Sequence, residues 1–263
     1  MELYLNKDTQ LCMSLAARPG NFGTRFHNYL YRELGLNFIY KAFTTSDLPS
    51  AIGGVRALGI RGCAISMPFK ERCIKHLNEL DVSAKGILSV NTIVNTDGYL
   101  KGYNTDYTAV SKLIRASGIP AHASFTLRGS GGMAKAVACA LRDAGFADGL
   151  IVARNETTGQ ALARQYGYRW KREPAEDERE LLVNVTPLGM AGGAQANELP
   201  FSEALVRSAQ FVFDVVALPP ETPAYSIGKL VGEVDCHGGR CDRASGNRTV
   251  CPLHRCSSER GTG

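Results

Sequence analysis

Residues 1–223 alternate between short β-rich runs and stretches with the spacing of amphipathic helices. The β-rich runs are 37–43, 61–66, 90–95, 123–128, 149–153, 181–185 and 211–216, and helical spacing covers 24–34, 46–58, 106–117, 132–144 and 156–166. Regular strand–helix alternation is typical of parallel sheets built from βαβ units. We therefore expect an α/β protein, with Asp97-Gly98 as a hairpin turn that makes one strand pair antiparallel.

The alternation occurs in two series, which indicates two domains. The chain has 263 residues, and a domain typically takes roughly 150 residues. A second βαβ series begins at Ala123, after the helical stretch 106–117. We expect an N-terminal α/β substrate domain at 1–103 and a Rossmann-like dinucleotide-binding domain at 104–223. The remainder, 224–263, is rich in Gly, Arg, Ser and Cys and lacks Phe, Trp and Met, so we expect an irregular tail.

Composition and charge exclude several classes of protein. Hydrophobic residues make up 44% and charged residues 21%, values typical of globular chains rather than disordered ones. No run approaches the ~20 apolar residues of a membrane span, and the N-terminus lacks the basic and apolar blocks of a secretory signal. We therefore expect a cytoplasmic protein without membrane contact. The net charge of +5 suits an anionic small molecule and is too diffuse to predict nucleic-acid binding.

A glycine-rich turn is the strongest local motif. Gly129-Ser130-Gly131-Gly132-Met133-Ala134 follows one β-rich run and opens the helical stretch 132–144. Glycines let the backbone approach a pyrophosphate closely, and the helix N-terminus offers free N–H groups. The alternative is an ordinary glycine-rich loop between a strand and a helix. The pattern therefore favours a bound dinucleotide.

Arg154 indicates which dinucleotide would bind. It follows the next β-rich run, at the place where NAD-specific sites usually carry Asp or Glu for the ribose 2′-hydroxyl. A guanidinium suits the 2′-phosphate of NADP, although a solvent-exposed surface arginine would give the same pattern. We expect NADP as the cofactor.

Six motifs follow one another in a fixed order between about residue 12 and residue 223. They are Ser66-Met67-Pro68-Phe69-Lys70-Glu71, Ser89-Val90-Asn91-Thr92, Gly102-Tyr103-Asn104-Thr105-Asp106, the turn at 129–134, Asn184-Val185-Thr186-Pro187-Leu188-Gly189-Met190, and Asp214 with Pro219 and Thr222-Pro223. In this order they resemble the shikimate dehydrogenase family, and more closely its shikimate dehydrogenase-like branch. The resemblance implies NADP-dependent interconversion of 3-dehydroshikimate and shikimate, or of a related small cyclic acid, in the chorismate pathway of aromatic amino acid biosynthesis. It also implies an active site in the cleft between two domains, in a monomer or homodimer.

The resemblance assigns the proton-transfer chemistry to Lys70 and Asp106. Hydride transfer to or from a ring carbon requires a proton to move to or from the oxygen on that carbon, and a lysine beside a carboxylate can move it. Without the resemblance, the simpler interpretation of Lys70 is a lysine that faces solvent. The corresponding interpretation of Asp106 is a carboxylate that starts a helix.

The resemblance also places polar groups around substrate and cofactor. Ser14, Ser66, Asn91 and Asn104 would contact the substrate, as short polar side chains at the ends of predicted strands. Turn formation is the alternative for the two asparagines. On the cofactor side the implied residues are Gly129, Ser130, Gly131, Gly132, Met133, Ala134, Arg154, Asn184, Thr186 and Met190. No catalytic metal is expected.

Some positions depart from the family pattern. Ala16, Ala64 and Ala217 stand where the family usually has Ser, Asn and Tyr. Each hydrogen bond lost from a polar pocket costs roughly 1–3 kcal/mol. An alternative function is therefore a dinucleotide-binding protein with weak or no shikimate activity.

The tail contains no pattern that matches the family's C-terminal helix and its glutamine. It carries instead a loose series of possible metal ligands, Cys236, His237, Cys241, Cys251, His254 and Cys256. Paired thiolates can bind zinc, and a nucleic-acid module is a related possibility, but the spacing is only weakly suggestive. Composition favours a non-native or irregular end over a zinc module.

Overall fold

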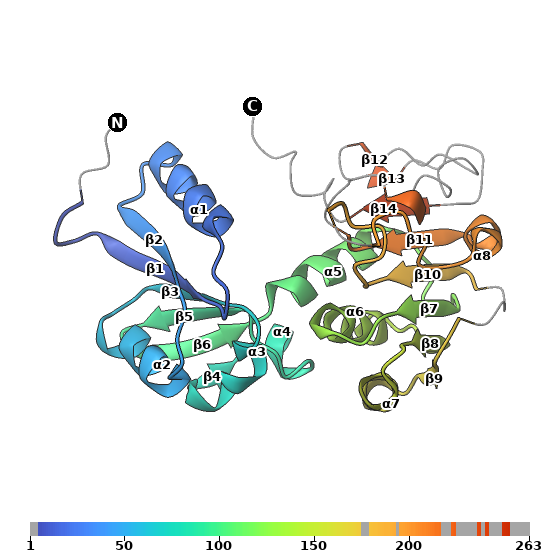
Figure 1. Cartoon of the computed structure of the whole chain (residues 1–263), viewed down its shortest axis with the longest axis horizontal. Helices are drawn as coiled ribbons and strands as arrows, with labels where there is room; N and C mark the ends of the chain where they lie inside the picture. The colour runs from blue at the N-terminus through green and yellow to red at the C-terminus, as the bar shows by residue number, and fades with distance from the viewer. Residues whose placement is uncertain are drawn as a thin grey trace. The chain divides into compact units, whose positions relative to one another are not determined.

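The computed structural model describes residues 5–174, 179–192, 195–216 and 222–224, and the backbone alone of 236–237, 240–241 and 249–252. The chain divides into two compact units, an N-terminal unit at 1–108 and a C-terminal unit at 109–263. Each unit has its own mixture of strands and helices (Figure 1), which confirms the expected α/β class. No helix in the described ranges has the length and apolar character that crossing a membrane requires.

The N-terminal unit is built on a mixed sheet with the strand order β2-β1-β3-β5-β6-β4. Its strands are β1 (Gln10–Leu15), β2 (Phe38–Phe43), β3 (Gly62–Ile65), β4 (Glu79–Leu80), β5 (Thr92–Thr96) and β6 (Tyr99–Tyr103). β1 pairs in parallel with β2 and β3, whereas β5 runs antiparallel to β3 and β6. Asp97 and Gly98 form the predicted turn between β5 and β6, with φ of 51° and 86°. Positive φ at both turn residues is what a tight hairpin requires.

Short helices connect these strands. They are α1 (Asn21–Glu33), α2 (Leu48–Ala57), α3 (Phe69–Arg72), the 3-10 helix η1 (Ile74–His76) and α4 (Val82–Lys85). Asp47 and Asp81 begin α2 and α4 by accepting backbone N–H groups from Ser50 and Ser83, the usual way in which an aspartate caps a helix. Ile52 and Val55 of α2 belong to the same apolar core as Ile93 of β5.

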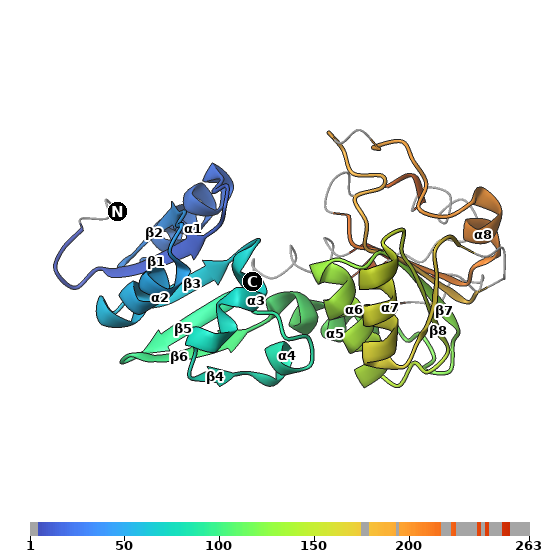
Figure 2. The ribbon, with the colours of Figure 1, turned by 60° about the horizontal axis from the view of Figure 1, so that its bottom comes forward.

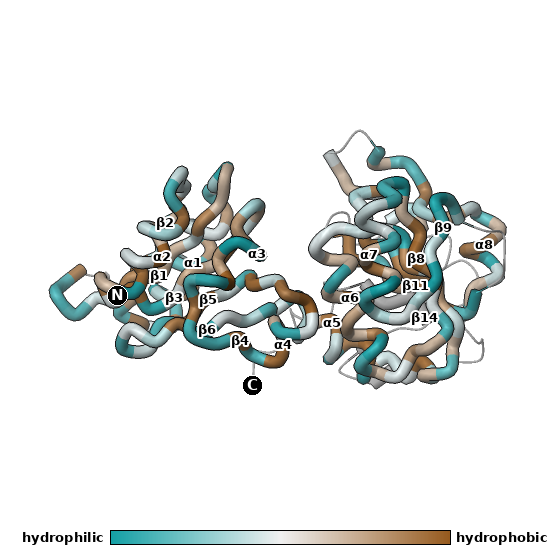
Figure 3. The backbone as a smooth tube through the Cα atoms, turned by 90° about the horizontal axis from the view of Figure 1, so that it is seen from below, coloured by the Kyte–Doolittle hydropathy of each residue, from teal (hydrophilic) through white to brown (hydrophobic). Residues whose placement is uncertain are grey.

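The C-terminal unit is built on a parallel sheet with the order β14-β11-β10-β7-β8-β9. Its strands are β7 (Phe125–Arg128), β8 (Gly149–Val152), β9 (Arg169–Lys171), β10 (Leu181–Asn184), β11 (Phe211–Asp214) and β14 (Thr249–Pro252). β8 and β10 are buried along their whole length, and β8 is coloured hydrophobic in Figure 3. From β7 the chain proceeds outward through β8 and β9 and then returns to β10 on the other side of β7. The gap between β7 and β10 is thus the switch point at which open α/β sheets bind ligands.

Helices of the C-terminal unit follow its strands. They are α5 (Thr105–Ala116), which begins in the N-terminal unit, α6 (Gly132–Asp143), α7 (Glu156–Tyr166) and α8 (Glu203–Ser208). Figure 2 shows α6 and α7 side by side. The strands β12 (Cys236–His237), β13 (Arg240–Cys241) and β14 lie within 224–263, where the sequence predicts no regular structure. β14 adds to the sheet beside β11 through backbone pairing, which residue periodicity in so short a segment does not reveal.

Candidate active site

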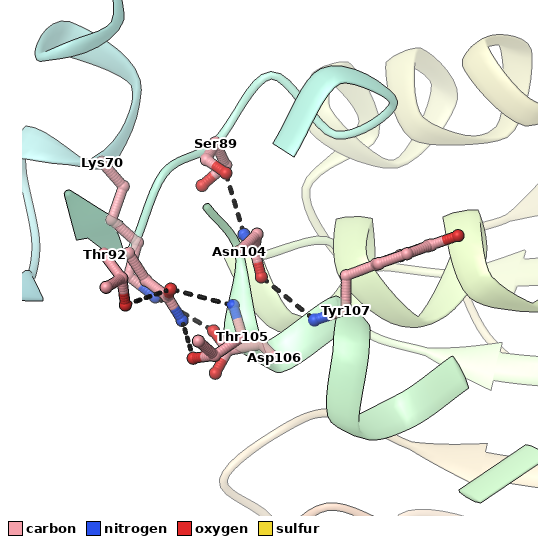
Figure 4. Close-up of polar contacts among 8 residues, drawn as sticks. Lys70, Ser89, Thr92, Asn104, Thr105, Asp106 and Tyr107 are labelled. Atoms are coloured by element: carbon pink, nitrogen blue, oxygen red, sulfur yellow. Dashed lines mark hydrogen bonds and ion pairs between the residues drawn. The ribbon is translucent and has the colours of Figure 1, made fainter. Parts of the chain in front are cut away.

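Lys70 and Asp106 form an ion pair within the N-terminal unit. The Lys70 Nζ lies 3.2 Å from the Asp106 Oδ2, and their side chains are 28% and 29% exposed (Figure 4). Lys70 lies on α3, which follows β3, and Asp106 lies in the first turn of α5, which follows β6. The partial burial of both side chains shields the pair from bulk water, yet leaves a face that a small molecule can reach.

Several polar residues lie at the same edge of this sheet as the ion pair. Ser66 follows β3 directly, Asn91 precedes the antiparallel β5, and Asn104 follows β6. Strand register explains the grouping, because Ala64 of β3 pairs with Thr92 of β5, and Thr92 pairs in turn with Tyr103 of β6. These two antiparallel pairings therefore bring the ends of β3 and β6 beside the start of β5.

Asn91 connects the start of β5 to the start of α5. Its Oδ1 accepts the backbone N–H of Thr105 at 3.0 Å and the hydroxyl of Thr92 at 3.1 Å. Its Nδ2 donates to the Thr105 hydroxyl at 2.9 Å. The side chain is only half-buried, so the second Nδ2 hydrogen can still bind a ligand.

Asn104 is placed differently from the other predicted substrate residues. It is only 2% exposed. Its Oδ1 accepts the backbone N–H of Tyr107 at 3.0 Å, and its Nδ2 donates to the Ser89 carbonyl at 2.9 Å. The amide is therefore occupied by the chain itself.

The two predicted serines lie on neighbouring strands. Ser14 is half-buried on β1, in register with Ala64 of β3. Ser66 is exposed, and its backbone N–H donates to the Leu15 carbonyl at 2.9 Å. Ala16 and Ala64, which replace polar residues of the family pattern, are both half-buried and add no hydrogen-bonding side chain. Ala217 lies outside the described residues.

A cavity of about 390 Å³ opens in the C-terminal unit at the switch point between β7 and β10. The residues of its wall that matter here are Gly129, Ser130, Gly131, Arg154, Arg172 and Thr186. Four of these six belong to the motifs that predict a dinucleotide: the three residues of the turn and Arg154. The cavity position also agrees with the rule that ligands bind beyond the carboxyl ends of parallel strands.

The glycine-rich turn combines one tightly packed glycine with two open ones. Gly129 has φ of 131°, and a Cβ there would lie 2.7 Å from the Val185 Cγ2. A Cβ on Gly131 or Gly132 would meet nothing within 4 Å. α6 begins at Gly132, and its N-cap, Gly131, provides no side-chain cap. The turn thus leaves open space and free N–H groups at the same place, which fits a pyrophosphate.

Positive charge surrounds this cavity. Burial lowers the pKa of the Arg128 guanidinium, and the nearby Arg154 lowers it further. Arg128 also donates to the Pro200 carbonyl. Arg154 and Arg172 are exposed, and Glu198 is an acidic residue of the same wall. Three guanidiniums beside a free helix N-terminus suit a ligand that carries several phosphate charges.

Arg172 was not predicted as a site residue. It follows β9, a strand of three residues that the sequence pattern does not reveal. A basic residue at the end of the third parallel strand could have indicated this role of Arg172. That signal can be used only if β9 is first recognised as a strand. Ser130 is fixed by a hydrogen bond of 2.8 Å between its Oγ and the Thr158 Oγ1, a contact that the sequence also does not show.

Other predicted cofactor residues do not line the cavity. Ala134 is fully buried and Asn184 is 1% exposed. The Asn184 Nδ2 donates to the Asp214 Oδ1 at 3.0 Å, and its Oδ1 accepts the Thr186 hydroxyl at 2.6 Å. Asn184 thus supports Thr186, which does line the cavity. Met133 is half-buried, and Met190 is 38% exposed.

The residues that the structure describes contain no group of three or more His, Cys, Asp or Glu side chains able to hold a metal ion. The cysteine and histidine side chains of the tail lie outside this description. The zinc interpretation of the tail therefore stays a prediction.

Comparison with known proteins places the chain in a family. Residues 22–93 match the model of the shikimate dehydrogenase substrate binding domain. The shikimate dehydrogenase-like protein of Haemophilus influenzae is 57% identical over 234 residues, covering 89% of this chain and 86% of that protein. The chain belongs to the shikimate dehydrogenase family. The NADP-dependent shikimate dehydrogenase of Halothermothrix orenii is 31% identical over 234 residues, covering 81% of this chain and 79% of that enzyme.

Solved structures of the family share the fold. A shikimate 5-dehydrogenase-like protein superposes with a TM-score of 0.83 at 55% identity, covering 86% of this chain and 84% of that one. The Thermus thermophilus shikimate 5-dehydrogenase, solved with NADP(H) and shikimate, gives a TM-score of 0.69 at 29% identity, covering 84% of each chain. The predicted family and its two-part architecture, with an N-terminal substrate domain and a Rossmann-like domain, are confirmed.

Proposed function

We propose that this family member is an NADP-dependent oxidoreductase that interconverts 3-dehydroshikimate and shikimate, or a related hydroxy-cyclohexane(ene) carboxylate. The observation that carries the proposal is the partly buried Lys70–Asp106 pair, 3.2 Å apart. Relatives named as shikimate dehydrogenases that use NADP support the choice of reaction. The same relatives support a small anionic substrate, and we propose a cytoplasmic location and a monomeric or homodimeric enzyme.

The cavity beside the glycine-rich turn would hold NADP. Gly129, Ser130 and Gly131 would bring backbone N–H groups to the pyrophosphate, and Arg154 and Arg172 would pair with the 2′-phosphate. When bound, NADP supplies or accepts the hydride. Thr186, held by Asn184, would contact the nicotinamide side of the cofactor.

Lys70 would move the proton that accompanies the hydride. Reduction of the ketone places charge on the carbonyl oxygen, and the Lys70 ammonium donates a proton to that oxygen as the charge develops. In the oxidative direction the Lys70 amine takes the same proton back. Asp106 would hold the ammonium in place through the Nζ–Oδ2 contact. The partial burial of both groups strengthens their interaction relative to a fully solvated pair.

Ser14, Ser66 and Asn91 would bind the polar groups of the substrate. All three lie at one edge of the N-terminal sheet together with Lys70. Hydroxyl and amide side chains suit the hydroxyl and carboxylate groups of such an acid. In this way the substrate oxygen would be presented to the Lys70 Nζ.

Replacing Lys70 tests the proposal. We expect Lys70→Ala to lower kcat for shikimate oxidation by about 10²–10⁴-fold, the usual contribution of a positioned general acid–base group. NADPH affinity, measured by fluorescence titration, should stay within about twofold. Lys101→Ala is the matched control, because Lys101 is 31% exposed and pairs with Glu79 at 2.8 Å in the same unit. The control should keep its kcat, and an active Lys70→Ala enzyme would refute the role.

A second candidate function is a dinucleotide-binding protein with little turnover of shikimate. Ala16 and Ala64 favour it, because they remove polar contacts from the substrate side while the cofactor cavity remains intact. Assay of the unmodified chain with NADP against shikimate and quinate separates the two functions. Cofactor binding without turnover of either acid would support this second function.

A further inference from the structure

We infer that Asn104 is a positioning residue for the Lys70–Asp106 pair, and that it acts through the backbone of both partners rather than by touching substrate. The inference rests on the proposed function, in which this pair transfers a proton. It differs from the role that sequence resemblance gives Asn104, namely a hydrogen bond to a substrate hydroxyl.

The burial of Asn104 argues against a substrate contact. The residue is 2% exposed, whereas the Lys70 and Asp106 side chains are 28% and 29% exposed. Its Oδ1 accepts the Tyr107 N–H, and its Nδ2 donates to the Ser89 carbonyl. Figure 4 shows this amide lying between the Ser89 loop and the start of α5. At 2% exposure the amide offers a ligand almost no accessible surface.

The first bond fixes Asp106. Asn104 immediately precedes α5, and its Oδ1 accepts the N–H of Tyr107, the third residue of the helix. This is the geometry of an asparagine N-cap. Asp106 lies between Asn104 and Tyr107 in the chain, so the cap holds the backbone on both sides of the carboxylate. The Asn104 N–H also donates to the Ser83 Oγ at 3.0 Å, which anchors the cap itself.

The second bond leads to Lys70. The Asn104 Nδ2 donates to the Ser89 carbonyl, and the next residue, Val90, donates its N–H to the Lys70 carbonyl at 2.9 Å. One side chain therefore joins the helix start that carries Asp106 to the segment that holds the backbone of Lys70. Because proton-transfer geometry is sensitive to displacements of about 1 Å, loss of this brace should reduce the rate without removing any group that binds substrate.

Steady-state kinetics of Asn104 variants give the first test. We expect Asn104→Ala to lower kcat by about tenfold while KM for shikimate stays within about twofold. Asn104→Ser should recover part of the lost kcat, since a serine hydroxyl can still cap α5. If Asn104→Ala folds poorly, the kinetics of Asn104→Ser still test the inference. A raised KM with unchanged kcat would show a substrate contact and overturn the inference.

Asn95 offers a matched control for the loss of a buried amide. It is 4% exposed, and its Nδ2 and Oδ1 bond to the Val55 carbonyl and the Gly98 N–H, both at 2.8 Å. These bonds support the β5–β6 hairpin and α2 and do not involve α3 or α5. Asn95→Ala should keep its kcat. An equal fall of kcat in Asn95→Ala and Asn104→Ala would mean general destabilisation and would overturn the inference.

A labelling experiment tests the brace without turnover. The rate at which an acylating reagent modifies Lys70 is measured by mass spectrometry in the unmodified chain, Asp106→Asn, Asn104→Ala and the double variant. We expect each single variant to speed labelling, because a Lys70 side chain that the carboxylate holds less firmly is freer to reach the reagent. The double variant should match Asp106→Asn alone, since Asn104 affects Lys70 labelling only through the ion pair, which Asp106→Asn already removes. Additive rates would overturn the inference.

The two tests separate failure of the inference from failure of the proposed function. If the unmodified chain turns over no shikimate or quinate, the proposed function is wrong, and the labelling cycle still decides whether Asn104 positions the pair. If the chain is active and the effects of Asn104→Ala and Asp106→Asn on the labelling rate add in the double variant, the proposed function stands and the positioning role is wrong.

Discussion

Two arginines at the cofactor cavity should determine the choice between NADP and NAD. Arg154 and Arg172 line the same cavity as the glycine-rich turn, and both are exposed there. We expect Arg154→Asp and Arg172→Ala each to weaken NADPH binding by about tenfold or more, the loss that follows from removing a charged hydrogen bond worth roughly 1.5–3 kcal/mol. NADH lacks the 2′-phosphate, so its affinity should hardly change in Arg172→Ala and should rise relative to NADPH in Arg154→Asp.

Fluorescence titration of both cofactors with each variant checks this prediction. Arg179→Ala is a useful control, because Arg179 lies in the same unit but pairs with Asp148 at 3.0 Å and does not line the cavity. If the preference for NADPH over NADH stays unchanged in Arg154→Asp, Arg154 does not bind the 2′-phosphate.

Individual residues also show what a sequence can and cannot reveal about a site. The family resemblance of two separate motifs implies that Lys70 and Asp106 act as a pair, and the structure brings their side chains together. The difference between Asn91 and Asn104 is not predictable from the same motifs. Each is an asparagine beside a strand end, and only the fold decides that one stays half-buried and the other becomes 2% exposed. Burial depends on which loop covers a side chain, and here Ser83 and Ser89 come from a separate segment.

At the scale of elements, the glycines of the turn between β7 and α6 have two different roles, one in the stability of the fold and one in the binding of the cofactor. Gly129 has φ of 131°, and a Cβ would lie 2.7 Å from Val185, so Gly129→Ala should destabilise the fold by about 1–3 kcal/mol through backbone strain and overlap. Gly131→Ala meets no atom within 4 Å. It should leave unfolding by urea nearly unchanged and weaken NADPH binding, because its methyl group enters the space left for the cofactor.

Urea unfolding and NADPH titration of both variants give a two-by-two comparison. If Gly131→Ala lost stability but bound NADPH normally, the open space at the turn would have no connection with the cofactor. The same result would weaken the assignment of the whole cavity.

The elements themselves were predictable in proportion to their length and burial pattern. α6 and α7 give clear helical spacing over 12 and 11 residues, and the fully buried β8 and β10 give continuous apolar runs. β4, with two residues, and β9, with three, are too short for any period to appear. The position of β9 mattered most, because Arg172 follows it and could not be assigned to the cavity without it.

At the scale of the whole molecule, the proposed cofactor residues and the proposed substrate residues lie in different compact units. Binding of the cofactor should therefore stabilise mainly one unit. The glycine-rich turn, Arg154 and Thr186 all belong to the C-terminal unit, whereas Lys70, Asp106 and the predicted substrate residues belong to the N-terminal unit. The predicted boundary at 103 falls just before α5, and the structure assigns residues up to 108 to the N-terminal unit. Asp106 thus starts a helix that continues into the C-terminal unit but remains with Lys70 in the first.

Hydrogen exchange with and without NADPH should therefore show a one-sided response. At NADPH concentrations about a hundredfold above Kd, binding adds about 2.7 kcal/mol to the stability of the state that binds it. We expect the greatest slowing of exchange at the N-terminal turn of α6, whose first N–H groups receive no side-chain cap, and in the strands β7 and β8. Exchange in β1, β2 and β3 should change much less. Arg154→Asp at the same NADPH concentration is the control, and a tenfold weaker affinity should reduce the added stability to about 1.4 kcal/mol. Protection concentrated in the N-terminal sheet would contradict the assignment, since it would place the cofactor's main contacts in the unit that carries Lys70 and Asp106.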